Sequence, residues 1–194
     1  MNRQAMAEPP APPSEPPDGL ALVRDFINTL HTDTGVHDDK LETAAGLERW
    51  LADHKLASGR QHFTAGDVAH AASVREALRD LLAANDGGEV PKEALETLSR
   101  AARCAQLHMT FEARGRARLR PAARGVDAAV GEVLARAFES MSDGSWRRLK
   151  ACHEPDCRWA FYDRSKNRTG SWCSMRSCGN RAKARRFRAR HAKD

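Results

Sequence analysis

The sequence predicts an α+β protein that is mainly α: a helical N-terminal domain with a small β-hairpin, followed by a small cysteine-rich C-terminal module. Apolar residues recur at helical spacing over most of the first 144 positions, and the period switches to two between residues 107 and 120. Between Cys152 and Cys178, four cysteines follow the spacing C-x4-C-x15-C-x4-C. The 194 residues, 41% of them hydrophobic, are enough for one ordinary domain and a small module.

We expect three parts in the chain. Residues 1–18 contain six prolines among alanines and acids, which predicts a disordered leader. Residues 19–144 form the mainly helical domain, and residues 145–194 form the cysteine module. The module has a net charge of +11, whereas residues 1–144 together have a net charge of −5. This asymmetry predicts a polyanion partner for the C-terminal part, most simply nucleic acid. A solvated basic tail without a partner is the alternative.

The N-terminus lacks the continuous apolar segment of a secretory signal, and the sequence contains no run long enough to span a membrane. We therefore expect a cytoplasmic protein without a membrane partner. In that reducing compartment, clustered cysteines bind metal more often than they form disulfides.

The first two helices are predicted from apolar spacing. One begins at Leu20, and a polar, glycine-containing break over residues 31–40 ends it. The second carries Leu47, Trp50 and Leu51 on one face.

The third helix has the clearest start signal. Thr64 and Asp67 form a variant capping box, and the apolar stripe that follows ends at the glycine pair 87–88. Pro91 suits the first turn of a fourth helix. The residues expected on the buried side of that helix are Leu95, Leu98 and Ala102. Cys104, near its end, is expected to be a small core residue.

A β-hairpin is predicted over residues 107–120, with its turn at residues 114–115 and arginines on one, exposed face. A long helix follows. Its expected buried stripe is Val126, Val130, Val133, Leu134, Ala137, Phe138 and Met141. Trp146 and Leu149 are expected to dock a short helix that delivers Cys152.

The four cysteines predict one structural zinc ion. Two close pairs, Cys152 with Cys157 and Cys173 with Cys178, can supply four thiolates to a tetrahedral Zn²⁺. Such a site is closed, and the sequence contains no other catalytic constellation, so we do not expect an enzyme. An iron or iron–sulfur centre is the alternative for this ligand set.

The module around the cysteines is expected to be a treble-clef-like finger. Residues 158–163 and 169–173 read as two strands, and a basic helix runs from Cys178 to His191. Phe187 is expected to pack on the hairpin, and Ala182 and Ala189 to face outwards between two basic stripes. The expected nucleic-acid contacts are Lys166, Arg168, Arg181, Lys183, Arg185, Arg186, Arg188 and Arg190.

These residues carry a family resemblance. The run Cys178-Gly-Asn-Arg181, preceded by Trp172-Cys173 and by the run 161–165, resembles the CGNR zinc finger of bacterial regulators. Upstream, residues 25–29, the helix at 47–51, the hairpin at 107–120 and the lead-in at 145–149 resemble the ABATE domain, the Putative stress-induced transcription regulator family. The resemblance implies a stress-responsive, DNA-binding transcription regulator with the four cysteines as zinc ligands.

The sequence is also compatible with other functions. The finger could instead hold RNA or an acidic protein as an adaptor, or act as a thiol redox switch that releases zinc. Asp25, Asn28 and Thr29 share one helical flank, which makes them candidates for a ligand pocket; helix-capping or hydrogen bonds between elements are the alternative explanation. A homodimer would set the spacing of half-sites on DNA.

Overall fold

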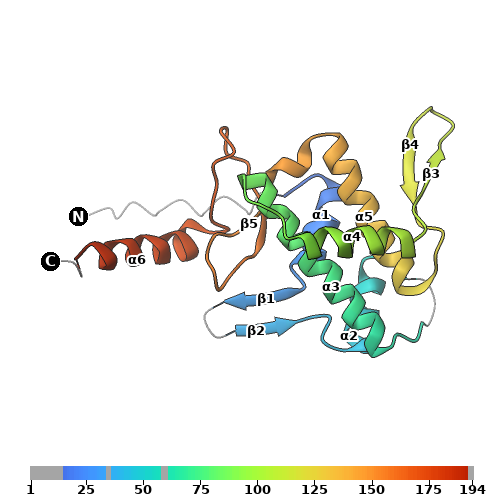
Figure 1. Ribbon diagram of the computed structural model, residues 1–194, viewed down its shortest axis with the longest axis horizontal. Coiled ribbons are helices and arrows are strands. Elements are labelled where there is room, and N and C mark those ends of the chain that lie inside the picture. The colour runs from blue at the N-terminus through green and yellow to red at the C-terminus, as the bar shows by residue number, and fades with distance from the viewer. Residues whose placement is uncertain (1–14, 34–35, 58–60, 192–194) are drawn as a thin grey trace, which may run out of the picture.

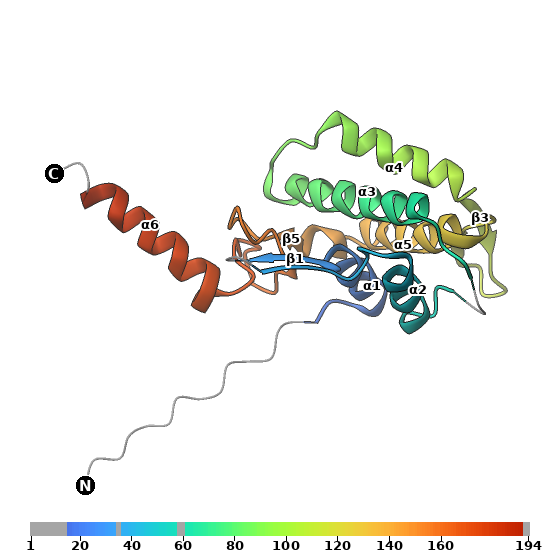
Figure 2. The ribbon, with the colours of Figure 1, turned by 90° about the horizontal axis from the view of Figure 1, so that it is seen from below.

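The computed structural model describes residues 15–33, 36–57 and 61–191. Four helices form its body: α1 (Asp18–Ile27), α3 (Ala65–Leu81), α4 (Lys92–Cys104) and α5 (Gly125–Ser142). Helix α2 (Ala44–Asp53) packs against α3, while α6 (Asn180–His191) projects away from the body (Figures 1 and 2). The expected leader lies mostly outside the described residues, although Pro17 already caps α1. None of the described helices is both long and apolar enough to cross a membrane.

In the described residues, three two-stranded antiparallel sheets accompany the helices. The pairs are β1 (Leu30–Asp33) with β2 (Val36–Asp39), β3 (His108–Phe111) with β4 (Ala117–Arg120), and β5 (Leu149–Ala151) with β6 (Ala160–Tyr162). The mainly helical α+β class is therefore confirmed, as is the hairpin predicted within residues 107–120.

The first helix ends before residues 31–40, as expected, but this stretch is not a simple break: β1 and β2 pair there as a hairpin. A buried arginine on α3 holds this hairpin in place. Arg75 is 3% exposed, and its guanidinium donates to both carboxylate oxygens of Asp39 at 2.6 and 3.0 Å. The sequence pattern does not reveal this long-range ion pair.

The core is continuous between the helical body and the C-terminal module. Phe26 of α1 and Trp50 of α2 meet with ring centroids 5.4 Å apart, and Val74 of α3 is fully buried beside them. The same cluster includes residues from beyond α5, namely Trp146, Leu149 and Ala160. The short 3₁₀ helix η2 (Ser145–Arg148) and β5 thus dock the cysteine module directly on the body, as expected for Trp146 and Leu149.

The predicted capping box of α3 is confirmed. Thr64 Oγ1 accepts a hydrogen bond from the N–H of Asp67, whose carboxylate accepts one from the N–H of Thr64. After Leu81 the chain continues as the 3₁₀ helix η1 (Leu82–Asp86), and Gly87 ends it with φ 77°.

Several apolar positions expected in the core are exposed. Leu95 is 46% exposed on α4, where Ala94 and Ala101 make the buried contacts instead. Phe138 and Met141 are exposed at the end of α5. Cys104 is exposed as well, which corrects its expected place in the core. Small residues on these helices permit close packing, and the larger neighbours are left on the outer side.

The strand pairing predicted within the C-terminal module is wrong. Strand β6 pairs with β5, and residues 169–173 form no strand. Side chains bind the backbone of the intervening loop instead: Lys150 Nζ donates to the carbonyls of Arg168 and Gly170, at 2.6 and 3.2 Å, and the Asp163 carboxylate accepts from the Gly170 N–H at 2.8 Å. These bonds give the backbone groups of the loop hydrogen-bond partners without a second strand.

Candidate metal centre and basic helix

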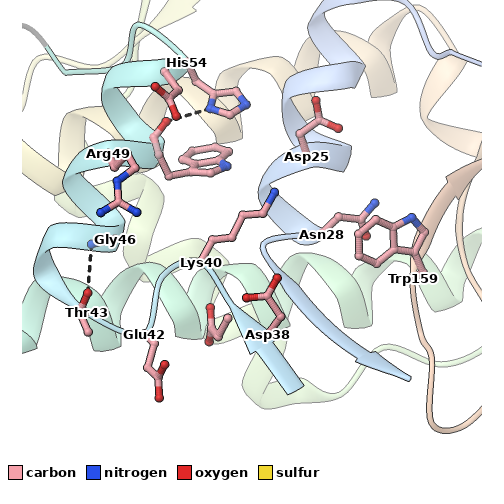
Figure 3. Close-up of a pocket in the computed structure, with 13 residues that line it drawn as sticks. Asp25, Asn28, Asp38, Lys40, Glu42, Thr43, Gly46, Arg49, His54 and Trp159 are labelled. Atoms are coloured by element: carbon pink, nitrogen blue, oxygen red, sulfur yellow. Dashed lines mark hydrogen bonds between the residues drawn. The ribbon is translucent and has the colours of Figure 1, made fainter. Parts of the chain in front are cut away.

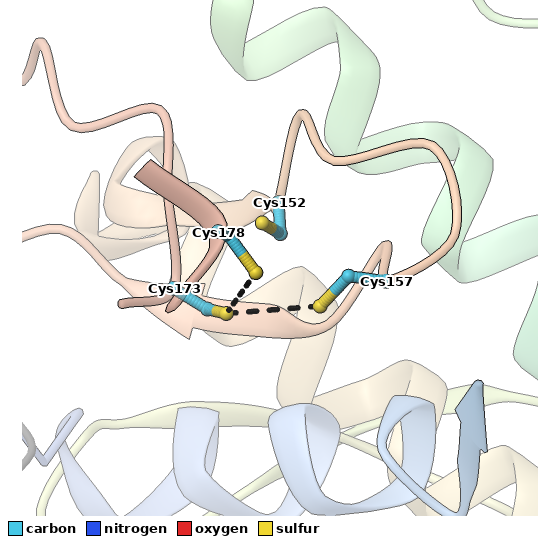
Figure 4. A group of neighbouring side chains, drawn as sticks. All are labelled: Cys152, Cys157, Cys173 and Cys178. Atoms are coloured by element: carbon cyan, nitrogen blue, oxygen red, sulfur yellow. Dashed lines mark hydrogen bonds between the residues drawn. The ribbon is translucent and has the colours of Figure 1, made fainter. Parts of the chain in front are cut away.

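The four cysteines expected to bind metal converge in one cluster (Figure 4). Cys152 follows β5, Cys157 precedes β6, and the other two precede α6. All four Sγ atoms lie within 4.8 Å of one another. Cys157 Sγ and Cys173 Sγ are 3.7 Å apart, and Cys173 Sγ and Cys178 Sγ are 3.6 Å apart. Four sulfurs at about 2.3 Å from a tetrahedral Zn²⁺ would be separated by about 3.8 Å, so the geometry fits that ion.

A bound cation would also change the ionisation of the cluster. Hydrogen bonds from the thiols of Cys157 and Cys173 lower the pKa of Cys152 to about 2. The hydrogen bond to Cys152 raises the pKa of Cys157 to about 12, and the pKa of Cys173 is raised by the same kind of contact. Without a metal, negative charge therefore concentrates on one sulfur. A dication allows all four sulfurs to be thiolates at neutral pH, which is the state that ligates zinc.

Backbone hydrogen bonds shape the first cysteine pair. The N–H of Cys157 donates to the carbonyl of Glu154 at 2.9 Å, and the N–H of Cys152 donates to the carbonyl of Trp159 at 2.9 Å. Arg158 has φ 47°, a left-handed conformation that turns the chain back into β6. His153 points elsewhere and contacts Asp86 at 3.1 Å. The site is therefore a closed four-cysteine centre suited to one structural zinc ion.

The second cysteine pair leads into the basic helix. Residues Met175–Gly179 form one π-helical turn, with the Ser174 side chain accepting from the N–H of Ser177 at 3.3 Å. Cys178, on this turn, is 1% exposed. Helix α6 begins immediately afterwards, so the metal site and the base of the helix are one local unit.

Two of the expected nucleic-acid contacts instead attach α6 to the rest of the protein. Arg181 contacts the Asp33 carboxylate of β1 at 2.6 Å and Cys178 Sγ at 3.1 Å. Arg185 donates to both carboxylate oxygens of Glu154, at 2.7 and 3.0 Å, and Glu154 is only 2% exposed. These two arginines set the direction in which α6 leaves the finger.

The opposite side of α6 faces solvent. Lys183, Arg186 and Arg190 share it, because their spacing of three and four residues returns to one helical face. Phe187 is 56% exposed beside them, so its expected packing on the hairpin is wrong. Ala182 is 5% exposed, which also corrects its expected place on the outer side.

The remaining expected contacts are exposed. Arg188 is exposed on α6. Lys166 and Arg168 are exposed in the loop that follows β6, and Arg168 has φ 53°.

The three candidate pocket residues, at and just after the end of α1, have separate roles. Asn28 is 7% exposed, and its side chain is hydrogen-bonded to the backbone of Ala160. Thr29 is 1% exposed; its Oγ1 donates to the Phe26 carbonyl at 2.8 Å and accepts from Arg75 at 3.3 Å. Asp25 pairs with its neighbour Arg24. Hydrogen bonds within and between elements therefore explain why Asn28 and Thr29 are polar although they are buried.

A cavity of about 620 Å³ nevertheless lies beside Asp25 and Asn28 (Figure 3). It lies between α1, α2 and the end of β2, and Trp159 of the cysteine module also lines it. Lys40 and Arg49 bring positive charge to the lining, and Figure 3 shows the Lys40 side chain extending towards α1. The acidic lining residues are Asp25, Asp38, Asp39, Glu42 and Asp53.

Sequence reasoning missed the residues that join the finger to the body. No pattern in the sequence distinguishes Glu154 or Lys150 from the other charged residues of the C-terminal module. Arg79 of α3, 3% exposed, donates to the carbonyls of Ile27 and Arg158 at 2.6 and 2.8 Å. The one available signal was that Arg75 and Arg79 lie on the apolar face of a helix, where a charged residue needs a buried partner.

Two family models match the chain. Residues 20–144 match the ABATE family, described as "Putative stress-induced transcription regulator". Residues 148–191 match the family described as "CGNR zinc finger". No curated protein matches the chain. The two matched ranges correspond to the helical body and to the finger with its basic helix.

Proposed function

The chain belongs to the ABATE family of "Putative stress-induced transcription regulator" proteins, and on this basis we propose that it regulates transcription by binding DNA through α6. In this proposal the zinc ion has a structural role. It would stiffen the finger from which the basic helix projects, and a stress signal would act on the helical body.

The observation that carries the proposal is the division of α6 into two faces. Arg181 and Arg185 hold the helix against Asp33 and Glu154, while Lys183, Arg186 and Arg190 remain exposed. A helix that only needed anchoring would not require a second basic face. Ion pairing on one side and exposed positive charge on the other are what a phosphate-binding helix needs.

The shape of α6 supports DNA as the polyanion. The helix has 12 residues and projects from the body, so it can enter the major groove without a clash from the helical domain (Figures 1 and 2). The exposed Phe187 ring adjoins the basic face and could contact bases or sugars. Lys166, Arg168 and Arg188 would widen the phosphate footprint.

The test is a fluorescence anisotropy titration of zinc-loaded protein with duplex DNA over a range of salt concentrations. The triple variant Lys183→Ala, Arg186→Ala and Arg190→Ala should reduce the salt slope by about 2.7, because each lost phosphate contact removes about 0.9. The control replaces two exposed arginines of α4, Arg100→Ala and Arg103→Ala, and should bind DNA like the wild type.

Zinc-loaded protein without DNA affinity at low salt would refute the proposal. Competition then separates the remaining classes of partner. If single-stranded RNA or an acidic protein displaces DNA from α6 at much lower concentration, the finger is an adaptor for that partner and not a DNA-binding module.

We also propose that the cavity beside Asp25 is the regulatory site of the helical body. Its lining combines Asp25 and Asp38 with Lys40 and Arg49, and indole rings contribute part of the wall. Mixed charge next to aromatic rings suits a small zwitterionic amine, whose ammonium would face the carboxylates. Because Trp159 follows Cys157 by two residues, a ligand here would also contact the finger.

Thermal unfolding with free amino acids and glycine betaine at millimolar concentration tests this second proposal. A saturable rise in Tm is expected with at least one probe, and both Asp25→Asn and Lys40→Met should abolish it. Glu96→Gln, on exposed α4, is the control. A rise that persists in both cavity variants would show that the cavity is not the binding site.

A further inference from the structure

The β3–β4 hairpin carries an apolar face that the described part of the chain leaves largely uncovered. Its register pairs Met109 with Leu119 and Phe111 with Ala117, so these four side chains lie on one face of the ribbon. Met109 is 56% exposed and Phe111 77% exposed. A two-stranded ribbon of this kind is marginal on its own in water, so its apolar face is expected to find a cover.

The apolar face continues onto the end of α5. Phe138 is 50% exposed and Met141, one turn further on, is 42% exposed. A groove of about 310 Å³ separates the hairpin from the helix, lined by Met109, Leu119 and Phe138 together with Glu139 and Asp143. Contiguous exposed apolar surface rimmed by polar groups is typical of a protein interface.

We propose that a second copy of this chain occupies the groove and forms a two-fold homodimer. A two-fold interface needs a surface that is complementary to itself. Here the hairpin projects from the body as an arm (Figure 1), and the receiving groove lies beside it, between the hairpin and α5.

The charges on this surface are also self-complementary. Arg114 and Arg116 lie at and beside the tip of the arm and are exposed, whereas Glu139 and Asp143 lie on the rim of the groove. Within the subunit, Arg116 is 3.7 Å from Glu112 and Glu139 pairs with Arg136. With a two-fold axis between arm and groove, the basic tip of each copy lies beside the acidic rim of the other. The dimer therefore contains two equivalent contacts of this kind.

The dimer determines where its two α6 helices can contact DNA; this step rests on the proposed DNA binding through α6. The hairpin and α6 lie at opposite ends of the molecule in both views (Figures 1 and 2). Pairing through the hairpin therefore places the two basic helices at the two far ends of an elongated dimer. Such a dimer bridges two separate DNA segments, whereas adjacent half-sites need two binding helices about one helical turn of DNA apart.

Analytical ultracentrifugation of the full-length, zinc-loaded protein tests the dimer. The wild type should reach twice the subunit mass of 21.4 kDa as its concentration rises. The double variant Met109→Ser and Phe111→Ser should weaken the association at least about tenfold, which is about 1.4 kcal/mol. Leu95→Ser, at another exposed apolar residue, on α4, is the control and should dimerise like the wild type.

A wild type that stays monomeric at all concentrations would overturn the proposal and would indicate a different protein as the occupant of the groove. A dimer that the double variant leaves unchanged would overturn it too, because the contact would then lie elsewhere.

A bridging assay separates the dimer from DNA binding. Two duplexes with different fluorophores should be drawn together by the wild type, and the Met109/Phe111 double variant should bind each duplex without joining them. The α6 triple variant should remain dimeric while losing affinity for both. A dimer without DNA affinity refutes only the proposed function, and a monomer that binds DNA refutes only the dimer.

Discussion

The side-chain amide of Asn28 binds both backbone groups of Ala160. Its Nδ2 donates to the Ala160 carbonyl and its Oδ1 accepts from the Ala160 N–H, each at 2.8 Å. Asn28 ends helix α1 and Ala160 begins β6, the strand that follows the first cysteine pair. One buried amide thus extends the β5–β6 sheet into the helical body, as a third strand would.

Replacing Asn28 with alanine should destabilise the protein by about 2–4 kcal/mol, because it leaves the buried N–H and C=O of Ala160 without partners. Urea unfolding of the zinc-loaded protein measures this. Asn167→Ala, at an exposed turn of the finger, is the control and should stay within about 0.5 kcal/mol of the wild type. Equal effects of the two variants would contradict the role of the amide.

Lys150 is the second tie between body and finger. It is 2% exposed, and its Nζ is 2.7 Å from the Asp86 carboxylate of η1 and 3.3 Å from that of Asp163. Lys150→Met should cost about 3–5 kcal/mol, because it leaves a buried carboxylate without its cation. Lys92→Met, in an exposed pair on α4, should cost less than about 1 kcal/mol in the same unfolding assay.

Asp163 makes the stability of the finger sensitive to acid. Burial alone would raise the pKa of Asp163, but hydrogen bonds from Ser165, Gly170 and Lys150 outweigh it, and the pKa is lowered below its ordinary value of 3.8. The charged form therefore stabilises the fold above that value, and this contribution is lost as pH falls through the lowered pKa. Asp163→Asn should abolish this part of the pH dependence in urea titrations between about pH 2 and 5.

Zinc content should follow the four-cysteine cluster. Cys157→Ser is expected to lose most of the bound zinc and to unfold the finger, because structural zinc contributes on the order of 10 kcal/mol in isolated fingers. Cys104→Ser, at an exposed cysteine outside the cluster, should keep one zinc per chain. Elemental analysis of both variants after dialysis provides the comparison, and retention of zinc by Cys157→Ser would exclude this ligand set.

Zinc binding should release protons at neutral pH. In the metal-free protein the pKa of Cys157 is raised to about 12 and that of Cys173 is also raised, so both carry protons at pH 7. At least two protons must leave, and affinity should rise about a hundredfold per pH unit. Competition with a chromophoric chelator between about pH 6 and 8 gives this slope; a slope below one proton would contradict the ionisation pattern.

The direction of α6 should depend on Glu154. Glu154→Gln cannot accept both hydrogen bonds from Arg185, so the base of the helix should open more often. Limited trypsin digestion is then expected to cut within α6 about fivefold faster while zinc content stays at one per chain. Glu89→Gln, at an exposed position, is the control. Unchanged cleavage would show that Arg181 and the metal site alone hold the helix.

Local patterns in the sequence were sufficient for the helices, the capping box at Thr64, the hairpin between residues 107 and 120 and the four-cysteine cluster. Each of these depends on neighbours in the chain: a helical period, a reciprocal cap, a turn or a cysteine spacing. The sequence could not show which basic residues of α6 are engaged, because Arg181 and Arg185 find their partners on other segments of the chain.

Tertiary packing decided the pairing of the other strands and which apolar residues are covered. The β1–β2 hairpin exists because Asp39 meets Arg75, and β6 pairs with β5 because Asn28, Lys150 and Asp163 satisfy the backbone around it. Packing also left Phe138 and Met141 uncovered, although their periodicity predicted that they lie in the core. Periodicity reports which side of an element is apolar. Whether another surface covers that side depends on contacts between segments far apart in the chain, and those exist only in the folded protein.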